Sequence, residues 1–371
     1  MERHVKISRF PRVGSAVMVG ALALSLAACG QNPGADAAAD GASASAGDLS
    51  GELSGGGASS QESAMEAWRA GFQGQYPDVT VNYDPVGSGG GRENFISGAF
   101  PFAGSDAALD DDELADAEAQ CGEGGVIEYP AYISPVAVAF NLEGIDSLNM
   151  TPETIAGIFK GDITTWDDAA IADDNPDADL PSTDITVVHR SDDSGTTENF
   201  QEYLSTVVPD VWTYEPEGIW PVDGQESAQG TSGVVSAAQA GEGTITYADA
   251  SQIADLGTVA VGVGEEFVEY SPEAAAAVIE GSPRVEGTSE HVFAYDLARD
   301  IEGTYPIVLV SYHLACATYE DAEQAELVKG FLGYVLSEEG QKAAADSAGS
   351  APLPTALAEE FAGAVDAITA G

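Results

Sequence analysis

The segment Arg190–Thr197 (RSDDSGTT) combines a guanidinium with a Ser-Gly-Thr turn. It follows the β-branched run Ile185–Val188, which predicts a buried strand, and precedes Glu198–Leu204, whose apolar spacing predicts a helix. The start of a helix presents unpaired amides, and the helix dipole favours negative charge there. Arg190 adds a fork of donors that suits a tetrahedral oxyanion. The segment therefore fits an anion site, and equally a helix start whose serine and threonine only cap it.

A second segment, Leu53–Ser60 (LSGGGASS), has a similar composition. It precedes residues 61–75, in which Ala, Trp and Phe recur every four residues and predict the buried face of a helix. Ser59 or Ser60 is expected at the N-cap of this helix. The glycines before them would let a ligand approach the backbone.

Two more strand ends carry small polar residues. The strand predicted at Val79–Tyr83 leads into Pro85–Arg92 (PVGSGGGR), a glycine loop that lacks the Gly-Lys-Ser/Thr of a P-loop NTPase. The short strand Phe102–Asp106 ends in Ser-Asp. An acidic residue is unusual in a loop that binds anions. The alternative is that Asp106 is a cap or turn residue for the following acidic stretch Asp110–Glu113.

Strand-type and helix-type segments alternate along the rest of the chain. Strands are predicted at 132–141, 244–247 and 305–310, and helices at 152–159, 271–280, 322–336 and 337–345. This alternation indicates α/β layers, in which ligands bind at the carboxyl ends of strands. A chain of this length is expected to form two domains.

The chain is strongly acidic, with 62 acidic against 12 basic residues and a net charge of −50. This charge argues against nucleic acid or an anionic membrane surface as a partner. An anion site must therefore rely on local dipoles and a rare basic residue, which singles out Arg190 and Arg92. Screening beyond about 8 Å at physiological salt makes such a site workable.

The N-terminus has the pattern of an export signal. Residues 1–29 begin with basic residues, continue with an apolar run and end in SLAAC, which resembles the lipobox of bacterial lipoproteins. The resemblance implies that Cys29 becomes the lipidated first residue of the mature protein; the alternative is an ordinary signal peptide with a chance cysteine. Residues 30–47 contain almost no large apolar residues and are expected to form a flexible tether.

Two cysteines remain, Cys121 and Cys316. In an exported chain they are expected to form a disulfide, and two buried thiols are the alternative. His189, His291 and His313 show no metal-ligand spacing, so no metal or cofactor is expected. An enzyme would pair Ser194 with His189 as its base, but their positions across a strand-to-helix turn do not favour that contact. A binding protein is expected rather than an enzyme.

In their order and spacing, these motifs resemble the phosphate-binding protein of the bacterial phosphate-specific ABC transporter, the PstS family. The resemblance also includes residues 158–166 and 351–354 and covers nearly the whole chain after the leader. It implies the two-domain periplasmic-binding-protein type II fold, an α/β fold in which each domain is a mixed sheet flanked by helices. Two crossover strands, near Tyr132 and Tyr305, would form the hinge. Domain I would combine residues 48–130 with 306–371, and domain II would span 131–305.

The family's binding residues carry over position by position. The resemblance implies the phosphate ligands Ser59, Ser60, Ser88, Asp106, Arg190, Ser194, Gly195 and Thr196. It also implies that Asp192 pairs with the arginine. The family commonly has Thr-Phe where this chain has Ser59-Ser60, so the aromatic is absent and the backbone amide of Ser60 is expected to serve.

The function implied by the resemblance is capture of inorganic phosphate outside the cytoplasm and its delivery to the permease subunits of an ABC transporter. A monomer is expected that reaches the membrane only through lipidated Cys29. Asp106 would select phosphate, because an ionised carboxylate accepts the proton that phosphate keeps at neutral pH and sulfate lacks. A site of this kind rejects the analogue without the hydrogen by about 10⁴–10⁵. The alternatives are a protein for sulfate or molybdate and a surface phosphate-sensing protein.

Overall fold

The computed structural model describes residues 49–285 and 289–371, which belong to one compact unit. The expected signal peptide (1–29), lipidation site Cys29 and tether (30–47) lie outside the described residues. No helix within the described ranges has both the length and the apolar character needed to cross a membrane.

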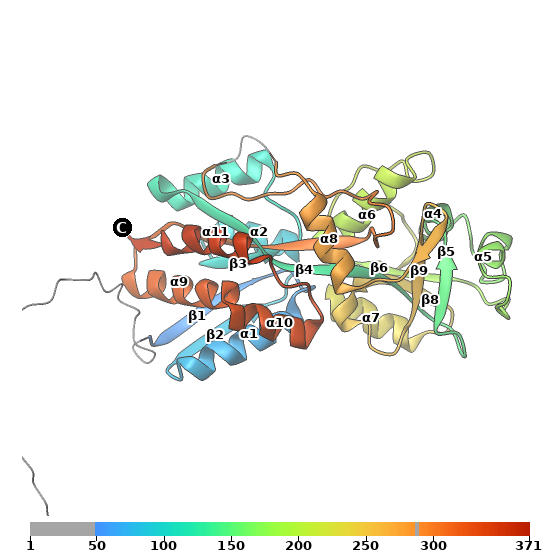
Figure 1. Cartoon of the computed structure of the whole chain (residues 1–371), viewed down its shortest axis with the longest axis horizontal. Helices are drawn as coiled ribbons and strands as arrows, with labels where there is room; N and C mark the ends of the chain where they lie inside the picture. The colour runs from blue at the N-terminus through green and yellow to red at the C-terminus, as the bar shows by residue number, and fades with distance from the viewer. Residues whose placement is uncertain (1–48, 286–288) are drawn as a thin grey trace, which may run out of the picture. The chain divides into compact units, whose positions relative to one another are not determined.

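Within these ranges, eleven strands form one mixed sheet with the order β2-β1-β3-β11-β4-β8-β6-β7, to which β5, β9 and β10 attach through β9 (Figure 1). Two further short strands, β12 and β13, pair separately. The strands are β1 (Gly51–Gly57), β2 (Val79–Asp84), β3 (Phe102–Ser105), β4 (Val126–Asn141), β5 (Ser147–Met150), β6 (Thr186–Arg190), β7 (Glu226–Ala228), β8 (Thr244–Asp249), β9 (Gly257–Val263), β10 (Glu266–Val268), β11 (Val308–Cys316), β12 (Thr318–Tyr319) and β13 (Thr369–Ala370).

The long strand β4 joins two groups of strands. Residues 126–135 of β4 pair antiparallel with β11, and residues 136–141 pair antiparallel with β8. We call β1, β2, β3 and β11 with their connections the first half, and β5 to β10 with their connections the second half. Each half contains a group of parallel and antiparallel strands flanked by helices, as expected, and the two groups are continuous because β4 is long enough to bond to both.

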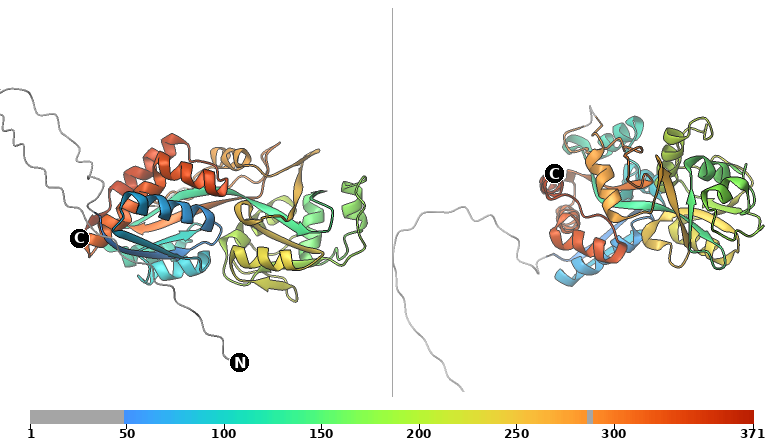
Figure 2. Two further views of the ribbon diagram at one scale, coloured as in Figure 1. Left: turned by 90° about the horizontal axis from the view of Figure 1, so that it is seen from below. Right: turned by 45° about the vertical axis from the view of Figure 1, so that its right-hand side comes forward.

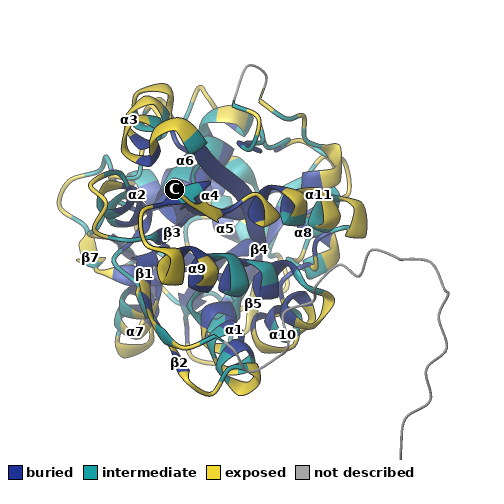
Figure 3. Cartoon of the chain, turned by 90° about the vertical axis from the view of Figure 1, so that its left-hand side faces the viewer, coloured by how far each residue is buried: buried dark blue, intermediate teal, exposed yellow. Residues whose placement is uncertain are grey.

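Helices flank the strands, and α9 and α10, from the end of the chain, lie beside α1 from its beginning (Figure 2). The outer faces of the helices are exposed, whereas the central strands β3, β4, β8 and β11 are buried (Figure 3). The helices are α1 (Glu62–Gln75), α2 (Ser88–Ile96), α3 (Asp111–Cys121), α4 (Pro152–Lys160), α5 (Ala169–Asp174), α6 (Gly195–Val207), α7 (Gly230–Ala240), α8 (Pro272–Gly281), α9 (Ala322–Leu336), α10 (Glu338–Ala348) and α11 (Thr355–Asp366), with short 3₁₀ turns η1 (Gly122–Gly124) and η2 (Ala250–Gln252).

Local sequence signals set most helix ends. Thr151 caps α4 by accepting a hydrogen bond from the amide of Thr154, and left-handed Gly161 ends the helix, as expected. The strand expected from Tyr305 begins only at Val308, because Pro306 has no amide to donate to a neighbouring strand.

The expected cap of α1 is wrong, and so is the alternative that Asp106 serves as a cap. Gln61, not Ser59 or Ser60, occupies the N-cap of α1, and no side chain caps that helix. Asp106 does not serve the following acidic stretch either. Asp110 caps α3 by itself, in a reciprocal capping box with Glu113. The side chains of Ser59, Ser60 and Asp106 are therefore available for other contacts.

Cys121 and Cys316 form the expected disulfide. Cys121 ends α3 and Cys316 ends β11, and they are 195 residues apart in sequence. The bond therefore ties an early helix to a late strand within the first half.

Candidate functional site

The candidate site lies where several strand ends meet. Strands β2 and β3 both run parallel to β1, so their carboxyl ends lie on the same edge of the sheet. The turns after them carry Ser59 and Ser60, Ser88, and Asp106. From the second half, β6 ends in Arg190 and leads to the start of α6. All these side chains are buried.

Asp106 connects the four segments. Its carboxylate Oδ1 accepts a hydrogen bond of 2.6 Å from Ser60 Oγ, and Oδ2 accepts one of 2.8 Å from Thr196 Oγ1. Its amide donates to Ser88 Oγ at 3.0 Å, and its carbonyl accepts from Asn199 Nδ2 at 2.8 Å. Since both carboxylate oxygens accept, the pattern is that of an ionised carboxylate, with acceptor positions to spare.

The pKa of Asp106 is shifted by opposing causes. Burial raises it, and the hydrogen bonds from Ser60, Ser311 and Thr196 and the charge of Arg190 offset this only in part, so the pKa lies above its usual value. A proton shared with a bound ligand therefore meets a more basic carboxylate than an exposed aspartate.

Arg190 is held by Asp192. Arg190 Nε donates to Asp192 Oδ1 at 2.8 Å, and Nη2 donates to Oδ2. The arginine is 3% exposed, and the pair fixes the plane of its guanidinium. Burial raises the pKa of Asp192, but the hydrogen bond and charge of Arg190 outweigh it and lower the pKa overall. Three of the five guanidinium N–H groups are not used by this pair.

The start of α6 is both capped and close to Asp106. Ser194 is its N-cap, and its Oγ accepts from the amide of Thr197 at 3.2 Å. The amides of Gly195 and Thr196, the first two helical positions, have no intrahelical acceptor. A Cβ on Gly195 would lie 2.8 Å from both Asp106 Cβ and Ser88 Oγ. The cap and the anion pocket are therefore compatible functions of one turn.

Ser59 makes contacts that the sequence did not predict. Its Oγ lies 3.1 Å from Thr231 Oγ1 and accepts from the amide of Thr231 at 3.0 Å. Gly230–Gly233 (GTSG) before an apolar helix repeats the pattern of the other four segments, so a signal for Thr231 was present. Asn199 and Gln252 also bond to the candidate loops, and no local pattern distinguishes them from surface amides.

Other singled-out residues are engaged elsewhere. Arg92 donates to Glu113 Oε1 at 2.9 Å and to Ser105 Oγ at 3.1 Å. His189 Nδ1 lies 2.8 Å from the carbonyl oxygen of Arg190, and its ring stacks on Trp220. The histidine that an enzyme would need as the base for Ser194 thus contacts Arg190 and Trp220 instead.

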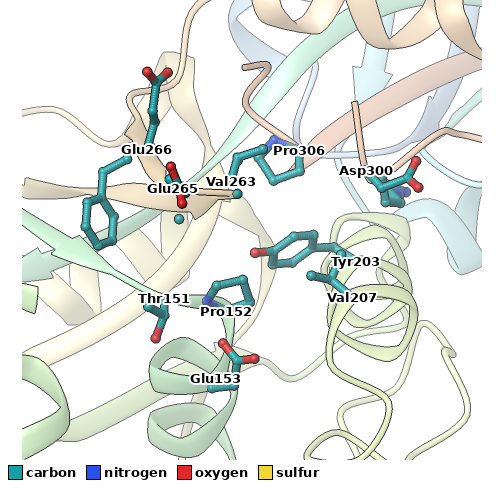
Figure 4. A pocket seen from close by; sticks show the side chains of 14 residues that line it. Thr151, Pro152, Glu153, Tyr203, Val207, Val263, Glu265, Glu266, Asp300 and Pro306 are labelled. Atoms are coloured by element: carbon teal, nitrogen blue, oxygen red, sulfur yellow. The ribbon is translucent and has the colours of Figure 1, made fainter. Parts of the chain in front are cut away.

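A separate pocket of about 390 Å³ lies between the start of α4, the C-terminal part of α6 and the β9–β10 turn (Figure 4). The hydroxyl of Tyr203 points into it, and Glu153, Glu265 and Asp300 stand around it (Figure 4). Its lining residues differ from those of the candidate site.

Comparison with known proteins gives matches over most of the chain. A family model described as a PBP superfamily domain matches residues 41–339. Phosphate-binding protein PstS 3 of Mycobacterium tuberculosis is 32% identical over 380 residues, covering 98% of this chain and 100% of that protein. Phosphate-binding protein PstS of Xylella fastidiosa is 32% identical over 313 residues, 82% of each.

Solved structures share the fold. The periplasmic phosphate-binding protein PfluDING, bound with phosphate, has a TM-score of 0.66 and 24% identity, covering 83% of this chain and 92% of that chain. A phosphate-binding protein from Stenotrophomonas maltophilia has a TM-score of 0.64 and 20% identity, covering 85% and 94%.

Proposed function

Because the chain belongs to the PBP superfamily and, within it, to the PstS phosphate-binding proteins, with their two-domain periplasmic-binding-protein fold, we propose that it captures inorganic phosphate for import by an ABC transporter. The observation that carries the proposal is the buried carboxylate of Asp106, facing the start of α6 beside the second-half cation Arg190. A protonated oxyanion is the ligand that needs an acceptor, a cation and free amides together.

The hydrogen bonds within the site indicate what each ligand residue contributes. A hydroxyl has one donor and two acceptor positions. Ser88 and Ser194 each accept from an amide, so their hydroxyl protons are free for phosphate. Ser60 and Thr196 donate their hydroxyl protons to Asp106, so their backbone amides remain to serve, together with the amide of Gly195. Ser59 contributes through its backbone.

Asp106 is proposed to determine the selectivity of the site for phosphate over sulfate. With two acceptor positions already used by hydroxyls, the carboxylate takes the proton that phosphate retains at neutral pH. Sulfate has no proton to give, and its lone pairs would face those of a buried carboxylate. Two buried charged acceptors that face each other without a proton between them cost more than the roughly 1–3 kcal/mol of one unsatisfied neutral group.

Capture is proposed to involve closure of two domains, 48–130 with 306–371 and 131–305. The hinge expected near Tyr132 and Tyr305 is proposed to include Pro135 and Val136, where β4 exchanges β11 for β8 as its partner. There Tyr305 Oη donates a hydrogen bond of 2.8 Å to the carbonyl of Val136. The segment that leads into β11 therefore contacts β4 at the same point. Closure buries the ligand between the domains and presents the closed form to the permease subunits.

The protein is further proposed to be a lipoprotein, held outside the cytoplasm by lipidated Cys29, and to bind rather than catalyse. The N-terminal sequence pattern supports the first proposal. The family supports the second, and so do the separate partners of His189 and Ser194. Loss of labelled-lipid incorporation in Cys29→Ser tests the anchor directly.

Calorimetric titration of the mature chain with phosphate tests the function. We expect a single site with submillimolar or tighter affinity, and unchanged binding in the presence of a large excess of sulfate. Molybdate serves as a second competitor. Failure to bind phosphate, or displacement of phosphate by sulfate at equal concentration, would refute the proposal.

A further inference from the structure

The contact between Ser59 and Thr231 links the two halves of the sheet across 172 residues. Ser59 follows β1 in the first half, and Thr231 lies in the first turn of α7 in the second half. Thr231 meets the serine Oγ with two groups, its amide at 3.0 Å and its hydroxyl at 3.1 Å. Both side chains are at most 2% exposed. Water is therefore excluded from the contact.

The start of α7 is also bonded to the partner of Arg190. The amide of Gly230 donates to Asp192 Oδ1 at 3.0 Å, the oxygen that also accepts from Arg190 Nε. Gly230 has a φ of +71°, a conformation that other residues rarely adopt, and it turns its amide and that of Thr231 toward different partners. Hydrogen bonds on two neighbouring amides of α7 thus connect Arg190 and Asp192 to Ser59.

The loop that holds Ser59 is bonded a second time from the second half. Gln252 Nε2 donates to the carbonyls of Ser59 at 2.8 Å and Ser60 at 3.1 Å. Gln252 ends η2, whose start is fixed by Asp249, which accepts from the amide of Ser251 at 2.9 Å. Since both carbonyls are held, the peptide planes that carry the amides of this loop are held too.

We propose that Thr231 is a positioning residue that latches the second half onto the Ser59 loop in the closed form, and that a bound anion strengthens this contact. The proposal rests on the proposed function. Thr231 bonds to Ser59 in the closed form with or without an anion. An anion on Arg190 further orders Asp192, which orients the start of α7 through the amide of Gly230. Thr231 touches no ligand. It acts by stabilising the closed form, so it controls how slowly phosphate leaves rather than how fast it arrives.

The hydroxyl of Ser59 uses its hydrogen-bonding capacity in the contact with Thr231. One acceptor position takes the amide of Thr231, and the remaining hydrogen-bonding capacity faces the threonine hydroxyl. The Oγ of Ser59 is therefore committed to the other half of the molecule in the closed form. In an open form both hydroxyls are hydrated, so the contact favours closure by the net worth of one or two hydrogen bonds.

Thr231→Val tests the latch, because it removes only the hydroxyl and keeps the shape. Measured by stopped-flow fluorescence with phosphate, we expect dissociation about 3- to 10-fold faster and association within twofold of the parent. Thr231→Ser should restore the parent rate. Ser232→Ala, an exposed neighbour in the same turn, is the matched control and should leave both rates unchanged.

A double-mutant cycle makes the test specific to the contact. In a Ser59→Ala background, Thr231→Val should add little further effect, because the partner hydroxyl is already gone. Additive effects of the two substitutions would refute the latch, and so would a parent-like dissociation rate in Thr231→Val.

Small-angle scattering separates failure of the latch from failure of the proposed function. Thr231→Val without ligand should have a larger radius of gyration than the parent, whether or not phosphate is the ligand. If the parent binds no phosphate, the proposed function is wrong, and the scattering alone decides the latch. Identical scattering of the two proteins, together with equal melting temperatures, would then overturn it.

Discussion

Thr196 Oγ1 and Asp106 Oδ2 are 2.8 Å apart, and this hydrogen bond joins the start of α6 directly to the end of β3. The two residues are 90 positions apart in sequence and come from the two halves of the sheet. The carboxylate that would select the ligand is therefore also a contact that holds the halves together. Substitutions at the site should consequently change both selectivity and closure.

Asp106→Asn should weaken phosphate binding at least about tenfold and make sulfate a measurable competitor. Asparagine has a single acceptor oxygen, and its NH₂ group donates where phosphate must also donate. Titration with each anion measures both effects. Asp110→Asn is the control, since it alters an exposed helix cap for which asparagine is an equal substitute. Unchanged selectivity in Asp106→Asn would rule out the function assigned to this carboxylate.

Asp192→Asn should weaken phosphate binding by about 10- to 100-fold, because hydrogen bonds to charged groups contribute about 1.5–3 kcal/mol. Calorimetric titration with phosphate measures this loss.

The same variant should change how stability depends on pH. The pKa of Asp192 is lowered in the folded protein, so its stabilising contribution is present above its usual pKa of about 3.9 and is lost as pH falls through the folded value. Melting temperatures between pH 3 and 7 should therefore fall less steeply in the variant than in the parent. An equally steep fall would show that the pair does not stabilise the fold.

Gly195→Ala should oppose closure. The new methyl would lie 2.8 Å from Asp106 Cβ, Ser88 Oγ and the amide of Ala107, so the two halves must separate slightly. Overpacking of this kind costs about 1–3 kcal/mol, and the affinity for phosphate should fall accordingly. Gly333→Ala, in α9, meets no atom within 4 Å and should bind phosphate normally. Calorimetry distinguishes the two variants, and equal affinities would contradict the close approach seen at Gly195.

Glu128→Gln should flatten the dependence of stability on pH. Glu128 is fully buried; its Oε1 accepts from the amide of Leu109 at 2.8 Å, and its Oε2 has no hydrogen-bond partner within the described part of the chain. Burial raises its pKa to about 8, which the Leu109 bond and Arg92 lower only in part.

Because this folded pKa lies above the unfolded value of about 4.3, the folded protein holds the extra proton. The stability that it contributes is complete below about pH 4 and is lost as pH rises through about 8. Urea unfolding at pH 5 and pH 8 should show a smaller difference in the variant than in the parent. Glu123→Gln, at an exposed position nearby, should retain the parent's difference.

Loss of the disulfide should destabilise the protein strongly. Cys121 and Cys316 close a loop of 195 residues, for which the chain-entropy model gives roughly 5 kcal/mol. A Cys121→Ser/Cys316→Ser double variant should melt well below the parent and retain phosphate binding at low temperature, since the bond lies at the far ends of α3 and β11. An unchanged melting temperature would contradict this stabilisation.

The sequence by itself determined the local elements and the short segments that carry most of the candidate site. Thr151 and Gly161 bound α4 as expected, because caps and left-handed glycines act within a few residues. Arg190, Asp192 and Ser194 follow one strand and begin one helix, so their proximity was also a local property.

Only the tertiary structure decided which distant groups share hydrogen bonds. Asp106 had two local interpretations, and its bonds to Ser60 and Thr196 removed the capping one. Thr231 carried a visible motif, but its partner lies 172 residues away. A hydroxyl can donate or accept in any direction, so its sequence neighbours do not fix its partner. The partner is determined by the tertiary structure, in which β4 brings the two halves of the sheet together.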